Sequence, residues 1–90
     1  MTSKIKGSGL TKKLYYGMPT DNANGWYYKD FDIASDVAQY GTPISIEAYG
    51  QYRNTATAHI AGTSIRAMTP INGITVYAYV TYSKNGVQII

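Results

Sequence analysis

The 90-residue sequence contains no cysteine and a single histidine, His59. Without cysteine the chain can form no disulfide or thiolate metal site, and it has no cysteine nucleophile. One histidine provides no imidazole pair for a metal, and no acidic residue adjoins it in the sequence to complete a catalytic set. Asp30 and Asp32 have the spacing of two calcium ligands, but the glycine turn and distal glutamate of a calcium loop are missing. We therefore expect no enzyme, no bound metal and no cofactor.

Leucine and long hydrophobic runs are also scarce. Leucine occurs twice, and the longest apolar-rich stretch runs only from Ile74 to Tyr82. A membrane-spanning helix needs roughly 20 such residues. The charged N-terminal residues are followed by no apolar run, so they do not predict a signal peptide. We expect no insertion into a membrane.

β-Branched and aromatic residues are abundant instead. Ten Ile, four Val and ten Thr accompany ten Tyr, one Trp and one Phe, a composition typical of strands. Apolar and polar residues alternate through most of the chain after residue 42, as they do along half-buried strands. The sequence predicts an all-β fold, a small antiparallel β-sandwich or barrel of about six to seven strands. The expected strands are 10–16, 26–31, 43–49, 55–61, 63–69, 74–82 and 87–90.

Glycine and asparagine mark the expected turns between these strands. Residues 17–25 are dense in turn-forming residues and are predicted to be a loop. Asn72-Gly73 and Asn85-Gly86 each carry the sequence signal of a β-hairpin. The second of these would pair residues 87–90 with the strand that precedes them.

One segment, residues 32–40, is a candidate for a short helix. Asp30 or Asp32 could cap its start, and Gly41 could end it. Because nine residues are marginal for a helix, a loop or irregular strand is the alternative. Residues 1–9 are expected to be a flexible arm or one that clasps a neighbour through Lys4, Ile5 and Lys6, and residues 10–90 a single β domain.

The ten tyrosines are too many for the core of so small a domain. Alternation places Tyr49, Tyr77 and Tyr79 on the face opposite the aliphatic residues of their strands. This surface has three interpretations: cross-strand aromatic pairs that stabilise a sheet, a protein–protein interface, or a platform for sugars or nucleic-acid bases. The candidate binding residues are Trp26, Tyr28, Tyr49, Tyr52, Arg53, Tyr77 and Tyr79.

Charge is distributed unevenly along the chain. Residues 1–20 have a net charge of +4, residues 21–40 of −3 and residues 41–90 of +2. These segments are either solvated surface or a means for copies to meet head to tail. A single-strand nucleic-acid binder is disfavoured, because no basic residue lies among the tyrosines between Ile74 and Tyr82.

Residues 42–90 resemble the distal domain of bacteriophage tail-fibre and receptor-binding proteins, which are similar to small H-type lectin sandwiches. The resemblance rests on the segments 42–49, 65–69 and 87–90, and above all on residues 72–77. In this last segment Asn-Gly-Ile-Thr-Val-Tyr is similar to the family's Gly-Phe-Thr-Val signature, with Ile74 in the place of the usual Phe.

The resemblance implies a non-enzymatic structural or adhesion protein of a virion, made in the host cytoplasm. Its partners would be further copies of itself, with a trimer favoured, together with other virion proteins or a host-surface glycan. No binding residue of the family transfers to this sequence. A capsid decoration or connector protein, and a small single-strand nucleic-acid-binding barrel, are the alternatives.

Overall fold

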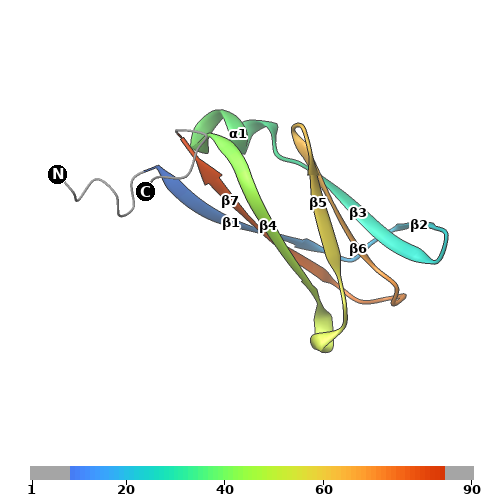
Figure 1. The fold of residues 1–90 in the computed structure, drawn as a ribbon. Helices are drawn as coiled ribbons and strands as arrows, with labels where there is room; N and C mark the ends of the chain where they lie inside the picture. The colour runs from blue at the N-terminus through green and yellow to red at the C-terminus, as the bar shows by residue number, and fades with distance from the viewer. Residues whose placement is uncertain (1–8, 85–90) are drawn as a thin grey trace.

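The structure is a computed structural model that describes residues 9–84 (Figure 1). Strands make up 61% of these residues and form two antiparallel sheets, accompanied by one helix. This confirms the expectation of an all-β, sandwich-like domain. The predicted contacts of Lys4, Ile5 and Lys6 lie outside the described residues. So do most of the second Asn-Gly hairpin and the strand expected at 87–90.

Sheet A has three strands in the order β1-β7-β4. These are β1 (Leu10–Gly17), β7 (Val76–Ser83) and β4 (Thr42–Gly50). The central strand β7 pairs with β1 on one side and β4 on the other over its whole length. The three strands follow the predicted ranges closely, because each has the period-two pattern that places one face in the core.

Sheet B has four strands in the order β2-β3-β6-β5. The outer strand β2 (Asp21–Ala23) lies inside the segment that was expected to be a loop, so that expectation was wrong. Asn24 and Gly25 both have positive φ, 53° and 86°, and form a two-residue turn that pairs Ala23 with Trp26. The remaining strands, close to the predicted ranges, are β3 (Trp26–Asp32), β6 (Ser64–Thr69) and β5 (Thr57–Ala61).

The Asn72-Gly73 turn does not form the expected hairpin. It connects β6 of sheet B to β7 of sheet A, so it carries the chain from one sheet to the other. β6 is already paired with β3 and β5, and it has no free edge for β7. The dipeptide still forms a turn, in which Gly73 has a φ of 83°.

The short helix α1 (Ala34–Tyr40) confirms the helical alternative. Asp32 Oδ1 accepts a hydrogen bond of 2.9 Å from Ala34 N before the first turn. Gly41 ends the helix with a φ of 103°, and a Cβ there would lie 2.3 Å from the carbonyl oxygen of Ser83. Figure 1 shows α1 at the end of the sandwich where β7 finishes and β4 begins.

The core lies between the two sheets and continues under α1. Val76, Ala78 and Val80 are fully buried on β7, as the alternation predicted. Tyr82 continues the same face and is also fully buried, although its ring carries a polar hydroxyl. Ile33, Ile65 and Ala67 complete the fully buried core, and Phe31, Val37 and Ile46 are among the side chains packed against it.

Candidate contact surfaces

The outer face of sheet A carries a row of three tyrosines. Strand register places Tyr16 of β1 opposite Tyr77 of β7, and Tyr77 opposite Tyr49 of β4. The next row holds Leu14, Tyr79 and Glu47, and the one after it Lys12, Thr81 and Ser45. We call these nine residues the tyrosine face. It brings together three predicted binding residues and adds Tyr16, which lies far from them in the sequence.

The rings of the tyrosine face stack on one another. The Tyr49 and Tyr77 centroids are 4.9 Å apart with an interplanar angle of 11°. Tyr16 stacks on Tyr77 at 5.9 Å, and Tyr49 on Tyr79 at 6.2 Å. Tyr16 remains 62% exposed and Tyr49 44% exposed, so the row presents a large aromatic area to its surroundings. A hydrogen bond with Tyr79 raises the pKa of the Tyr49 hydroxyl above its ordinary value.

One positive and one negative side chain lie on this face. Lys12 Nζ is 3.7 Å from Glu47 Oε1 and 5.3 Å from the ring centroid of Tyr79. A basic residue therefore does lie among the tyrosines, contrary to the argument from residues 74–82. It comes from β1, and sequence spacing alone could not place it there. Because Glu47 balances it, the face has no excess of positive charge to attract a nucleic-acid backbone.

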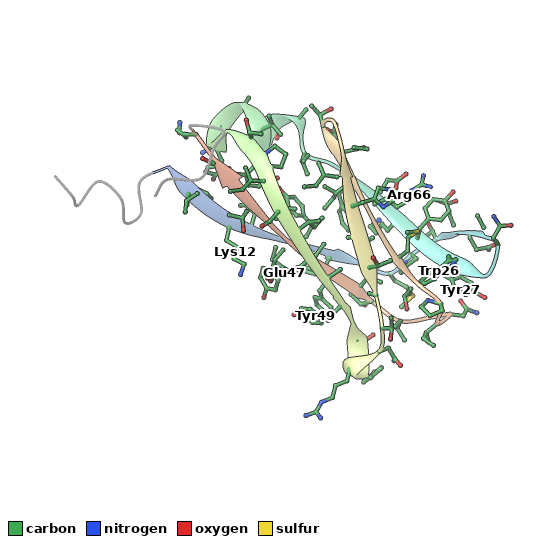
Figure 2. The ribbon with its side chains drawn as sticks, viewed as in Figure 1. Lys12, Trp26, Tyr27, Glu47, Tyr49 and Arg66 are labelled. Atoms are coloured by element: carbon green, nitrogen blue, oxygen red, sulfur yellow. The ribbon has the colours of Figure 1, made fainter. Side chains whose placement is uncertain are left out.

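The outer face of sheet B is organised around Arg66. Its Nε and Nη2 atoms donate to the two carboxylate oxygens of Asp30 at 2.7 and 2.9 Å, and its Cζ lies 4.0 Å from the ring centroid of Tyr28. Hydrogen bonding to Arg66 lowers the pKa of Asp30, and the same contact raises the pKa of Arg66. Trp26, at the start of β3, is 37% exposed. Figure 2 shows Trp26 and Arg66 on the opposite side of the molecule from Lys12 and Glu47.

Tyr52 and Arg53 lie at a third location, in the turn η1 (Gln51–Arg53) that follows β4. Both have left-handed backbone conformations, with φ of 61° and 65°. Gln51 anchors the turn, because its backbone N donates to Thr75 O and its side-chain Oε1 accepts from Thr75 N. Tyr52 is 79% exposed. The seven predicted binding residues thus occupy two opposed sheet faces and one turn rather than a single surface.

A polar cluster that the sequence did not reveal lies at the α1 end of the core. Tyr15 of β1 donates a hydrogen bond to Asp36 of α1, and its hydroxyl also contacts that of Tyr82. Lys13 Nζ lies 3.8 Å from the Asp36 carboxylate. Burial raises the pKa values of Tyr15 and Tyr82, and the contact with Asp36 raises that of Tyr15 further. This cluster explains how Tyr82 can be buried.

The described part of the chain offers little to an enclosed ligand. Residues 9–84 form no detectable pocket and contain no group of three side chains that could hold a metal ion. Within the same range, no helix has the length and apolar character needed to cross a membrane. Comparison of the chain with protein-family models, curated proteins and solved structures found no match.

Proposed function

We propose that this chain is a non-enzymatic structural protein of a phage-type virion, and that it acts by packing its tyrosine face against another protein subunit. The observation that carries the contact role is the row in which exposed Tyr16 and Tyr49 flank the partly buried Tyr77 on the outer face of sheet A. Tyrosine is enriched in protein interfaces because it combines a large apolar area with a polar tip. The virion setting rests on the resemblance of residues 42–90 to phage fibre tips.

Stacking within the row favours a protein partner over a sugar. A carbohydrate packs on the open face of an aromatic ring, and the ring faces of Tyr77 and Tyr49 lie against each other. Because Tyr77 stacks on both neighbours, its ring faces are not free for a sugar, and the row suits a second protein face better. The absence of a pocket in residues 9–84 agrees with a broad, flat contact.

A second candidate function, contact with a host-surface glycan, is favoured by Trp26. Its side chain is 37% exposed, and none of the ring contacts in the described residues involves it. An open indole face is a suitable platform for a sugar ring. In this version the adhesive surface lies on sheet B, so the two candidates use opposite sides of the domain.

Particle association tests the first candidate. The protein is expressed in its native phage or producing cell, and particles are separated on a density gradient. The wild type is expected to sediment with particles, and Tyr49→Ser to remain near the top of the gradient. Tyr28→Ser, on the outer face of sheet B, is the matched control and should sediment as the wild type does.

Two outcomes would overturn the proposal. Wild-type protein that never sediments with particles contradicts a structural role in a virion. Equal association of the Tyr49→Ser variant contradicts the use of the tyrosine face. A glycan array probed with the wild type and Trp26→Ala tests the second candidate, which requires a saturable signal that the substitution removes.

A further inference from the structure

We infer that the partner of the tyrosine face is a second copy of this chain, packed face to face about a two-fold axis that runs parallel to β7. This inference rests on the proposed contact role and names the partner. It follows from the register of sheet A and from the positions of the two charged residues on the face.

Lys12 and Glu47 lie on opposite edges of sheet A. Lys12 belongs to β1 and Glu47 to β4, with β7 between them. A two-fold axis along β7 places β1 of each copy over β4 of the other. Lys12 of each copy then faces the Ser45 position of the other, one row from Glu47. Rows on one strand face are about 7 Å apart, which a lysine side chain can span.

The same operation matches the aromatic residues. Tyr16 of each copy faces Tyr49 of the other, and the two Tyr77 side chains meet near the axis. Packed sheets keep their strand directions within about 30°, as this arrangement requires. Each copy thus offers two charges and an aromatic row that complement those of an identical copy, which is the requirement of an isologous contact.

A two-fold axis that crosses the strands does not satisfy the charges. It places β1 over β1 and β4 over β4, so the two Lys12 side chains lie toward one edge of the pair and the two Glu47 side chains toward the other. The two Lys12–Glu47 ion pairs would then point the same way with like charges adjacent, whereas the axis along β7 sets them in opposite directions. The distribution of charge therefore selects the axis along β7.

The size of the face predicts a weak and reversible pair. Eight residues on each of three strands give a flat area of about 27 by 14 Å, or about 400 Å² per copy. A pair would bury about 800 Å² in total, which is below the range of stable specific interfaces and within that of weak, transient contacts. Association must therefore be measured over a wide concentration range, by sedimentation velocity up to about 1 mM protein.

Charge reversal provides a sharp test. Lys12→Glu alone leaves two acidic side chains on each face, and Glu47→Lys alone leaves two basic ones. Each variant alone is expected to pair at least tenfold more weakly than the wild type. An equimolar mixture of the two should form a mixed pair, because every reversed charge then meets its opposite on the other copy.

The double variant Lys12→Glu with Glu47→Lys is the control for misfolding and for loss of the ion pair between positions 12 and 47 within one chain. It keeps one charge of each sign on the face and should pair as the wild type does. A wild type that stays monomeric at every concentration overturns the inference and leaves another protein as the partner of the face. Pairing of the wild type without association in the mixture excludes this arrangement. Pairing that survives Tyr49→Ser contradicts both the inference and the contact role, whereas loss of pairing in that variant supports both.

Discussion

The outer faces of the two sheets satisfy their side chains in different ways. On sheet B, Arg66 makes two short hydrogen bonds to Asp30 and stacks on Tyr28, so its polar groups are paired within the face. On sheet A, the tyrosines contact one another, and the single ion pair is longer and more exposed. A partner can bury the large aromatic area that these tyrosines leave exposed. An aromatic-rich sheet is therefore a candidate interface where its rings have no cationic side chain over them; among the described residues this holds for the row of three tyrosines, although Lys12 lies over Tyr79.

The first prediction extends this comparison to the inner faces. Ile65 lies on β6, inside sheet B, and is fully buried, whereas Ile46 lies on the edge strand β4 of sheet A and is partly buried. Ile65→Ala should lower the free energy of unfolding by about 3 kcal/mol, because it leaves a cavity in a packed interior. Ile46→Ala should cost about 1 kcal/mol, since neighbours and water can fill part of the space. Urea unfolding followed by circular dichroism measures both, and equal losses would contradict the difference in burial.

The second prediction concerns the aromatic row itself. Tyr77 stacks on both Tyr16 and Tyr49, so Tyr77→Ala removes two cross-strand ring contacts at once. We expect a loss of about 1–2 kcal/mol in the free energy of unfolding. Met68 occupies the outer face of β6 in sheet B and is the matched position, where Met68→Ala should cost less than about 1 kcal/mol. Thermal unfolding of both variants checks the order, and a reversed order would contradict the special role of the row.

The sequence predicted which face of its strand each side chain occupies, but it did not predict which strands are neighbours in a sheet. Alternation along residues 74–82 correctly predicted that Val76 and Val80 point inward and Tyr77 outward, because the period of two is a property of one strand. It could not place Lys12 over Tyr79, and it could not show which sheet contains the strand after the Asn72-Gly73 turn. Both depend on the order of strands in the sheets. The Asn-Gly signal fixes a local turn and leaves open which sheet receives the next strand.

Tyr82 shows a second limit of the sequence pattern. Its position on the inward face of β7 follows from the alternation, but a buried tyrosine needs a partner for its hydroxyl. That partner is Tyr15 on β1, which in turn donates to Asp36 on α1, and nothing in the local sequence connects either residue with Tyr82.

The third prediction contrasts the inner and outer tyrosines of sheet A. Burial raises the pKa of Tyr82 above its ordinary value of 10.0, so the folded state keeps its proton while the unfolded state releases it. The associated stability is complete below about pH 10 and is lost as the pH rises above that value. Tyr82→Phe should make this alkaline loss shallower, at a cost of about 1 kcal/mol at neutral pH.

Urea unfolding at a series of pH values measures this effect as the difference between each variant and the wild type. Tyr49→Phe is the comparison from the outer face: a hydrogen bond with Tyr79 also raises the pKa of Tyr49, but water screens this exposed contact, so the alkaline slope should change less than in Tyr82→Phe. A Tyr82→Phe slope that matches the wild type would contradict a raised pKa for this buried group.

The smallest expected effect concerns the ion pairs of the two outer faces. Arg66→Lys replaces two parallel hydrogen bonds to Asp30 with one point charge. The two side chains are 41% and 49% exposed, so water screens the pair and the loss at neutral pH should be small. Lys12→Met should cost still less, because the contact of Lys12 with Glu47 is longer and more exposed.

Titration of the Asp30 carboxyl by NMR gives a second measure that does not depend on small stability differences. Arg66 holds the pKa of Asp30 below its ordinary value of 3.8, so the stability that the pair contributes is present above that value and is lost as the pH falls below it. In Arg66→Lys the pKa of Asp30 should move up toward the ordinary value, and the acid-side loss should become smaller. If the pKa of Asp30 in Arg66→Lys equals that in the wild type, the two hydrogen bonds from the guanidinium are not the cause of the lowered pKa. Sheet B would then not differ from sheet A in the way its outer charges are paired.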